Sequence, residues 1–272
     1  MVRYSNEELL NIIDKCENKY GKVSEKLINN DSDFCHSSTI SSRFGTFSNA
    51  KLKSDIENVG QIHLTDTERE KINNSITERQ KNIMKGILMG DAWICKEENK
   101  TPYLAIENTN KEFMFWLEDE LKSLCSDLRI RNTAKESANK NKQYGYTVNE
   151  ENYNDIWVFE TRSLKYFNKL REWYDTGQKR IPENLELEPI ILKLWYCCDG
   201  SLAKNKYPVI YSSNENDRKS DILDIFEEIN MEPSFTDGGG GCINFKNSGA
   251  EDFFNYIGKP LPGFEYKWLD NY

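Results

Sequence analysis

Two apolar segments, each ending in an acid, constrain the fold of this chain more than any other feature. Residues 84–92 (MKGILMGDA) and 192–200 (LKLWYCCDG) each predict a buried helix that ends on an aspartate followed by a small residue. Strand-like runs and then an amphipathic helix follow each segment. Because this order occurs twice, the sequence predicts an internal duplication with two similar α+β halves.

The two halves are placed at residues 77–182 and 183–272. Each is expected to begin with its apolar helix, over about 77–90 in the first half and from Pro189 in the second. The remaining predicted elements of the first half are strands over 103–108, 144–149 and 156–162 and a helix over 110–124. Those of the second half are a strand over 207–213, a helix over 217–230, a hairpin around the glycines at 238–241 and a helix over 248–258.

The N-terminal residues 1–58 predict a separate, small all-α module. Ser5 and Glu8 form a capping-box pattern at the start of its first helix, and Gly21 is placed to end that helix. Two more short helices are expected at about 22–30 and 37–44. Three short helices can form a helix-turn-helix that enters a DNA groove, although a protein-interaction module fits the same pattern. Residues 59–76 are expected to be a linker.

The net charge argues mildly against a nucleic-acid partner, but the charge distribution does not. The chain has 36 basic and 45 acidic residues, a net charge of −9, and phosphate contacts need Lys and Arg. Within residues 128–142, however, five basic residues stand against the single acid Glu136. This cluster is a candidate DNA-binding patch, with a solvated surface as the alternative.

Nothing in the sequence indicates a membrane protein or a zinc protein. No apolar run approaches the length of a membrane span, and the N-terminus lacks the apolar core of a signal peptide. The seven cysteines and two histidines show no zinc-ligand spacing. We therefore expect an intracellular protein, cytoplasmic or organellar, with cysteines as small buried groups.

The aspartates that end the two apolar helices are expected to lie side by side. Gly86 and Gly90 lie four residues apart on one helix face, so another helix backbone can approach closely there. If the apolar helices pack together, Asp91 and Asp199 meet at two negative helix ends. A cation would relieve this repulsion, and oxygen ligands favour Mg²⁺. Carboxylates that share divalent ions are a recurring arrangement for phosphodiester hydrolysis. Either acid alone would more readily be a solvated helix-terminal residue.

The segments MKGILMGDA and LKLWYCCDG resemble the two signature helices of the LAGLIDADG homing endonucleases. The stretch WYDTGQKRIPENLELEPIILKLWYCCDGSL and the motif FEYKW resemble further parts of the family pattern, so the similarity spans about 77–272. The N-terminal module is similar to a helical repeat often attached to these enzymes. Two signatures in one chain imply a monomer with pseudo-twofold αββαββα halves and two antiparallel, saddle-shaped sheets.

The resemblance also implies the residues of an active site. The catalytic acids of the family correspond to Asp91 and Asp199, which would bind Mg²⁺, with Mn²⁺ able to substitute. Its basic pocket residues correspond to Lys179 in QKRIP and Lys267 in EYKW. These lysines would polarise ordered water or the scissile phosphate.

The chain departs from the family pattern at two positions of the second signature. Leu194 stands where the signature has its first glycine, which is expected to change the helix spacing there. Cys198 stands where an acid is often found before Asp199. Neither departure removes a predicted catalytic group.

The family fold implies that the concave sheet faces follow the major groove of double-stranded DNA. Polar side chains at every second strand position would then face the bases. The predicted DNA-binding residues are Arg129, Arg131, Lys135, Lys140 and Lys142 in the first half, Lys204, Lys206, Ser212 and Asn214 in the second, and Arg43 in the N-terminal module.

We therefore expect a site-specific homing endonuclease that makes a metal-dependent double-strand break in a long, asymmetric DNA target. The final residues LDNY are not the junction expected of an intein, which favours a free-standing or intron-encoded enzyme. Two alternatives use the same scaffold: a maturase that binds intron RNA, and a DNA-binding regulator that does not cleave. Neither needs all four predicted catalytic residues, and their presence favours the enzyme.

Overall fold

The computed structural model describes residues 4–20, 23–54, 65–95, 100–203, 206–237 and 241–269. The chain divides into two compact units, Met1–Asp66 and Thr67–Tyr272, each with its own apolar core. The two units are described separately.

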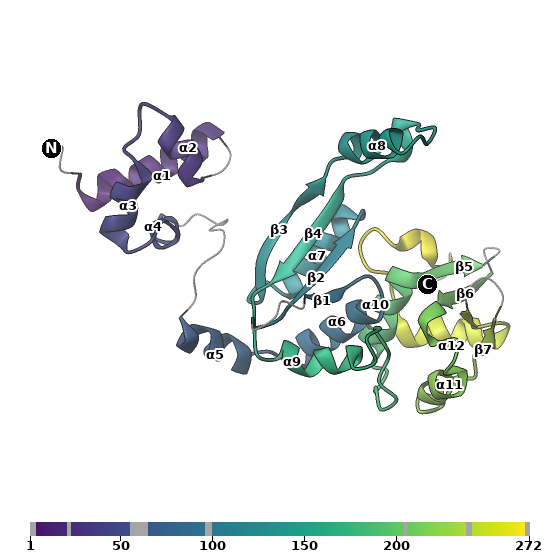
Figure 1. Cartoon of the computed structure of the whole chain (residues 1–272). Helices are drawn as coiled ribbons and strands as arrows, with labels where there is room; N and C mark the ends of the chain where they lie inside the picture. Colours follow the sequence, from purple (N-terminus) through teal and green to yellow (C-terminus); the bar gives the residue numbers. More distant parts are fainter. Residues whose placement is uncertain are drawn as a thin grey trace. The chain divides into compact units, whose positions relative to one another are not determined.

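The first unit is all-α (Figure 1). Its helices are α1 (Asn6–Tyr20), α2 (Glu25–Asn30), α3 (Ser37–Phe44) and α4 (Phe47–Lys53). The sequence predicts only the first three of them. Helix α4 begins after Gly45, whose φ of 83° ends α3, and after Thr46, whose hydroxyl accepts a hydrogen bond from Asn49 N at 3.0 Å. Its core contains side chains from all four helices, among them Leu9, Ile13, Ile28, Ile40 and Ala50.

The second unit contains two copies of the order helix, two strands, helix, two strands, helix (Figure 1). Helix α5 (Asp66–Asn74) precedes the first copy. That copy consists of α6 (Glu78–Met89), β1 (Trp93–Cys95), β2 (Tyr103–Asn108), α7 (Lys111–Glu120), β3 (Cys125–Asn132), β4 (Ile156–Thr161) and α9 (Phe167–Leu170), with α8 (Ala134–Gln143) inserted between β3 and β4. The second copy consists of α10 (Pro189–Asp199), β5 (Gly200–Ala203), β6 (Tyr207–Tyr211), α11 (Lys219–Glu227), β7 (Ser234–Thr236), β8 (Cys242–Asn244) and α12 (Ser248–Ile257).

Each copy forms one four-stranded antiparallel sheet with the same strand order. The orders are β1-β2-β4-β3 and β5-β6-β8-β7. The registers correspond as well, because Trp93 pairs with Ala105 in the first sheet as Ser201 pairs with Val209 in the second. The predicted α+β fold with duplicated αββαββα halves is confirmed.

One predicted strand, over 144–149, is wrong. That segment contains no strand, and Tyr144 and Tyr146 within it are 69% and 67% exposed. Their aromatic side chains favour a strand, but nothing pairs with the segment, and a strand is stable only within a sheet.

Besides β2, the strand that pairs with β4 is β3, which begins before and ends within the cluster that the sequence marks only as basic. In β3, Leu128 and Ile130 alternate with Arg129 and Arg131, which is the two-residue period of a half-buried strand. A capping box between Thr133 and Glu136 then starts α8. Lys135, Lys140 and Lys142, which the sequence marks only as candidate DNA-binding residues, consequently lie on a helix.

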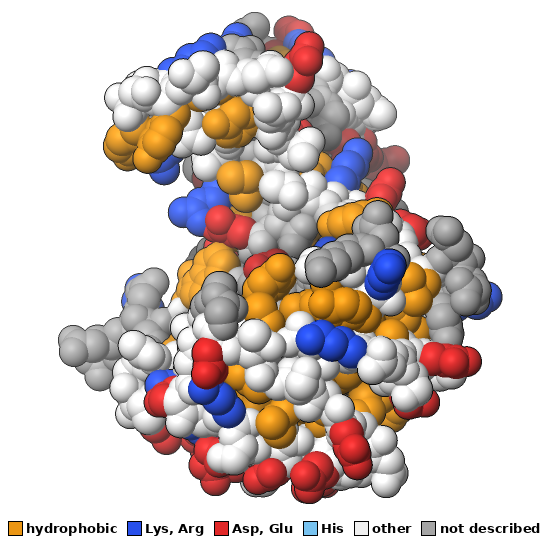
Figure 2. Space-filling view, turned by 90° about the vertical axis from the view of Figure 1, so that its right-hand side faces the viewer, with side chains coloured by type: hydrophobic (Ala, Val, Ile, Leu, Met, Phe, Trp, Pro, Cys, Tyr) orange, Lys and Arg blue, Asp and Glu red, His pale blue; other side chains and the backbone are white. Residues whose placement is uncertain are grey.

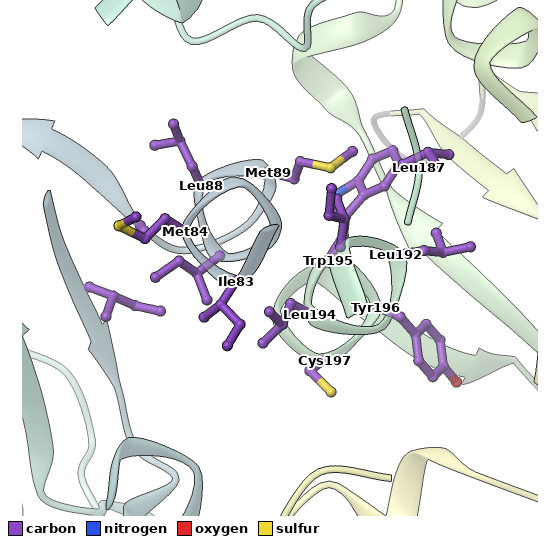
Figure 3. Packing of buried hydrophobic residues seen from close by; sticks show 14 of the residues in the cluster. Ile83, Met84, Leu88, Met89, Leu187, Leu192, Leu194, Trp195, Tyr196 and Cys197 are labelled. Atoms are coloured by element: carbon purple, nitrogen blue, oxygen red, sulfur yellow. The ribbon is translucent and has the colours of Figure 1, made fainter. Parts of the chain in front are cut away.

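Helices α6 and α10 pack directly against each other, with Ile83 and Leu194 between them (Figure 3). A Cβ added to Gly86 would lie 2.8 Å from the Cβ of Leu194, and one added to Gly90 would lie 2.2 Å from the Cβ of Cys198. Leu194 is fully buried at this contact, where Gly86 leaves room for it. Gly86 of α6 and Gly90, which directly follows this helix, therefore permit the close approach.

Candidate active site

The packing of α6 against α10 brings the ends of the two helices together. Asp91 follows the last turn of α6, where Gly90 N donates to Ile87 O at 3.1 Å, and Asp199 is the last residue of α10. Asp91 is exposed, and its Oδ2 accepts a hydrogen bond from Asn108 Nδ2 at 3.0 Å. Asp199 is half-buried.

The environment of Asp199 favours its neutral form. Burial and, second, the negative charge of Asp91 raise the pKa of Asp199 to about 6. The positive charges of Lys179 and Lys267 and a hydrogen bond from Trp195 oppose this rise. Because the charge of Asp91 contributes to this rise, the two carboxyl groups share one electrostatic environment.

Two lysines hold the C-terminal ends of the same two helices. Lys179 Nζ donates to the backbone oxygens of Gly90 and, at 3.1 Å, of Ala92, both beside Asp91. Lys267 Nζ donates to Cys197 O at 2.6 Å, close to Asp199. Burial lowers the pKa of both lysines, and the negative charges of Asp91 and Asp199 oppose this effect for each. Each lysine thus binds backbone oxygens beside one of the two acids.

Lys179 is positioned by an anchored connecting segment. Ile181 N donates to the carboxylate of Glu215 at 2.9 Å, and Glu215 is only 2% exposed. Arg218 donates to Ile181 O at 3.1 Å and forms an ion pair with Glu215. Arg180 forms an ion pair with Asp217 at 2.6 Å. These contacts tie the QKRIP segment to the start of α11.

The equivalent lysine of the second half is also held in place. Tyr196 of α10 donates through its hydroxyl to Lys267 O at 2.6 Å, and the Tyr196 ring stacks edge-on against Trp268. Lys267 itself is only 9% exposed. Both ends of Lys267 are therefore held by hydrogen bonds, its backbone oxygen by Tyr196 and its ammonium group by Cys197 O.

A pocket of about 250 Å³ opens beside Asp199. Its lining includes Gly90, Trp173, Lys179, Trp195, Ser212 and Glu215. Among the described residues no third His, Cys, Asp or Glu joins the two aspartates in a metal-binding cluster. Two hard carboxylates that repel each other fit divalent cations whose other ligands are water and phosphate oxygens.

Two residues that position the site are absent from the sequence-based prediction. Asn108 donates a hydrogen bond to Asp91. Its counterpart in the second half is Ser212, because the registers match Ala105 with Val209 and each residue lies three positions further along the chain. Glu215 is buried and anchors the QKRIP segment. Only the duplication, aligned strand by strand, could have indicated Asn108, and no local pattern marks Glu215.

The basic residues predicted to bind DNA in the first half fall into two groups. Arg129 and Arg131 lie on β3 and form ion pairs with acids of the same sheet, Arg129 with Asp127 and Glu160 and Arg131 with Glu107. The predicted residues of α8, Lys135, Lys140 and Lys142, are exposed.

The remaining predicted DNA-binding residues are scattered. Lys206 is exposed in the turn before β6, and Asn214 is exposed beside the pocket, where its backbone oxygen accepts a hydrogen bond from Arg180. Ser212 is buried. Arg43, in the first unit, donates to Tyr4 O at 3.3 Å. Lys204 lies outside the described residues.

Much of the acidity of the second half lies away from its sheet. Figure 2 shows acidic side chains along the lower margin of one face, at the height of α11 in Figure 1. The sequence of α11, KSDILDIFE, contains three acids. An acidic margin repels a nucleic acid, so this margin is a disfavoured surface for such a partner.

Comparisons with known proteins agree with this architecture. A model of the LAGLIDADG DNA endonuclease family matches residues 81–253. "Uncharacterized protein MJ1098" of Methanocaldococcus jannaschii is 28% identical over 134 residues, 48% of this chain and 47% of that protein. The chain thus spans about half the length of the curated relative it matches.

One solved structure shows the same fold. The homing endonuclease I-WcaI, bound to its DNA recognition sequence, matches with a TM-score of 0.61 and 19% identity over 76% of this chain and 96% of its own. I-DmoI, in complex with DNA and Mn, matches with a TM-score of 0.39 and 14% identity over 65% of this chain and 94% of its own. None of the described helices is long and apolar enough to cross a membrane.

Proposed function

The chain belongs to the LAGLIDADG DNA endonuclease family, and on this premise we propose that it is a site-specific homing endonuclease. It binds a long, asymmetric DNA target as a monomer and makes a metal-dependent double-strand break. The observation that carries the proposal is the pair of aspartates, Asp91 and Asp199, held at adjacent helix ends although burial and mutual repulsion raise the pKa of Asp199 to about 6. Such an arrangement costs free energy in the free protein and is stabilised by bound cations.

The residues divide the chemistry between them. Asp91 and Asp199 would hold divalent cations, Mg²⁺ with Mn²⁺ as a substitute. Bound there, such cations would lower the pKa of a water molecule and stabilise the charge on the phosphate. Lys179 donates two of its three N–H groups to Gly90 O and Ala92 O, and Lys267 donates one to Cys197 O. Each lysine keeps at least one N–H for ordered water or a phosphate oxygen.

DNA would lie along the sheet faces that the helices leave uncovered. Residues 77–182 and 183–272 would each contact one half-site as repeats of one nuclease domain. The exposed lysines of α8 and Lys206 would add phosphate contacts. Residues 1–58, including Arg43, would form a DNA-binding module beyond the core target, joined through the linker at 59–76.

The experiment that tests this function is cleavage of a plasmid that carries the uninterrupted insertion locus of the gene. We expect a linear product with Mg²⁺ and binding without cleavage with Ca²⁺, which is larger and less strict in coordination geometry. Binding to intron RNA without cleavage in any divalent ion would instead identify a maturase. Specific DNA binding without cleavage would identify a regulator.

Replacing either lysine by methionine should reduce cleavage without reducing DNA affinity. Lys179→Met and Lys267→Met remove a preorganised donor, which typically lowers the rate by about 10² to 10³. The measurement is the single-turnover rate beside the dissociation constant in Ca²⁺. Lys122→Met changes an exposed lysine on the turn after α7 and serves as the control. Equal rates in all three variants would remove the lysines from the mechanism.

Cleavage should also depend on pH through Asp199. Below the raised pKa of about 6, Asp199 is protonated and cannot hold a cation, so the rate should rise with pH and level off above that value. Because Mg²⁺ competes with the proton, a higher Mg²⁺ concentration should move the midpoint to lower pH. The measurement is the single-turnover rate from about pH 5 to about pH 8 at two Mg²⁺ concentrations. A rate that stays constant over this whole pH range at both Mg²⁺ concentrations would contradict the assignment.

A further inference from the structure

Each sheet has one face toward the core and one open face. In the first sheet Leu104, Ile106 and Phe159 belong to the apolar core. Side chains alternate along a strand, so Ala105, Glu107 and the other residues in register with them point to the opposite, open face. In the second sheet Ile210 and Ile243 belong to the core, and their strand neighbours form the corresponding open face.

All charged residues of the first sheet lie on its open face. Its strands, WIC, YLAIEN, CSDLRIRN and IWVFET, contain five charged residues. Arg129 is in ion-pair contact with Asp127 and, at 3.2 Å, with Glu160, and Arg131 is in contact with Glu107. The two arginine side chains are 47% and 56% exposed. This face thus presents charged hydrogen-bonding groups in fixed pairs.

The described strands of the second sheet, GSLA, YPVIY, SFT and CIN, contain no charged residue. The exposed Lys246, two residues beyond Asn244 of β8, is a charge at the margin of the open face, where its ammonium group lies over the Tyr207 ring. The shared register identifies the substituted positions, because Ala105 pairs with Glu160 as Val209 pairs with Asn244. By the same registers the equivalents are Tyr211 for Glu107, Asn244 for Glu160, Ser234 for Asp127 and Thr236 for Arg129. Every charged position that has a described equivalent is therefore neutral in the second half.

These two faces suit different base pairs in a major groove. Arginine forms bidentate hydrogen bonds with guanine, and a carboxylate accepts from the amino group of cytosine. Hydroxyl groups bind either kind of base pair, whereas methyl and apolar groups contact the thymine methyl. Thr236 and Tyr211 are exposed and offer both kinds of neutral contact. The amide of Asn244 already donates to Ser234 O, Thr236 Oγ1 and Cys242 O, which removes it as an adenine-reading group.

We propose that the two halves of the protein select DNA half-sites of opposite base composition. The first sheet requires G·C pairs under Arg129 and Arg131, and the second sheet accepts A·T pairs. The proposal rests on the proposed function, in that DNA lies along the open faces. Arg129 uses three of its five N–H groups on Asp127 and Glu160, which leaves two for guanine. The acids hold the guanidinium group in one orientation and, being negative, disfavour phosphate at the same place.

The test is a selection of bound sites from a randomised duplex library in Ca²⁺, where binding is separated from cleavage. In the selected sites we expect guanine or cytosine at positions in one half and adenine or thymine in the other. Each position read by an arginine should prefer its base pair about tenfold to a hundredfold.

Variants assign the two halves of the selected site. Arg129→Thr, which introduces the residue of the second half, should abolish the preference at one or two adjacent positions and leave the other half-site unchanged. The reciprocal Thr236→Arg should create a guanine preference in the other half-site. Arg79→Gln is the control, because Arg79 forms an exposed ion pair with Glu120 on a helix rather than on a sheet face. Thermal unfolding verifies that each variant is folded.

Two results would overturn the proposal. One is a selected site with the same base composition in both halves, and the other is a wild-type preference that Arg129→Thr leaves intact. Plasmid cleavage in Mg²⁺ is scored separately, so an enzyme that cuts a site of uniform composition would sink this inference while retaining the proposed function. A protein that selects the expected bases but never cuts would support this inference and contradict the proposed function. No enrichment of any sequence would reject both.

Discussion

Asp199→Asn is expected to abolish the double-strand break while making the free protein more stable. The substitution removes a ligand for the cation, whose contribution to transition-state stabilisation is several kcal/mol, so the cleavage rate should fall by about a thousandfold or more. DNA affinity in Ca²⁺ should change little, because most binding free energy comes from contacts with the sheets and phosphates. The measurement is the single-turnover appearance of linear product in Mg²⁺.

The stability change follows from the pKa of Asp199. This pKa is raised from 3.8 to about 6, so between those values the folded protein holds a proton that the unfolded chain has released. Stability therefore falls as pH rises through this window, and the full cost is present above it. Removing the charge should raise the free energy of unfolding at pH 7 by about 1–2 kcal/mol.

Urea unfolding in the presence of a chelator checks this change. The difference between wild type and Asp199→Asn should be present at pH 7 and should shrink toward zero near pH 4, where both side chains are neutral. Asp119→Asn, at an exposed acid of α7, is the matched control. Linear product formed at the wild-type rate, or an unfolding free energy lowered at pH 7, would contradict the role given to Asp199.

Gly90→Ala is expected to destabilise the protein strongly, by about 3 kcal/mol, because the new methyl group has no space. It would lie 2.2 Å from the Cβ of Cys198 and 3.0 Å from its Sγ. Relieving the overlap must separate α6 from α10 and so displace Asp91 relative to Asp199. Cleavage should therefore fall even at temperatures where the variant stays folded. Urea unfolding and single-turnover cleavage measure the two effects.

A second substitution and a distant glycine control this prediction. Cys198→Gly in the same chain removes the opposing side chain and should restore much of the lost stability. Gly249→Ala in α12 meets no atom within 4 Å and should be neutral or slightly stabilising, since alanine favours a helix. If Gly90→Ala were as harmless as Gly249→Ala, the close helix contact would not hold the site together.

Local patterns in the sequence predict most of the described helices and five of the eight described strands. The strand β2 and the helix α10 lie where the hydrophobic pattern and the terminal acid place them. The failures also have local causes. Tyr144 and Tyr146 favour a strand by their aromatic side chains, although no strand forms there. The strand β3 is not predicted, because its arginines give it the composition of a solvated surface.

The pairing of charges across the first sheet also cannot be predicted from local sequence patterns. Arg129 and Arg131 are recognisable as candidate DNA ligands from their type alone. Their acidic partners, Glu107 and Glu160, lie on other strands, and only the sheet register brings them together. The match between charged strand positions of the first sheet and neutral strand positions of the second therefore appears only when the two registers are aligned.

The resemblance to the family indicated Lys179 and Lys267 as site residues. The sequence by itself determined the duplication and the aspartate that ends the signature helix of each half. These features depend on residue type and spacing along one segment, which short-range physical rules can interpret. The tertiary structure alone decided that Gly90 meets Cys198, that Lys179 and Lys267 bind the helix-end carbonyls, and that Glu215 anchors the connecting segment. It also decided the raised pKa of Asp199, because burial and the charge of Asp91 arise only when distant segments pack together.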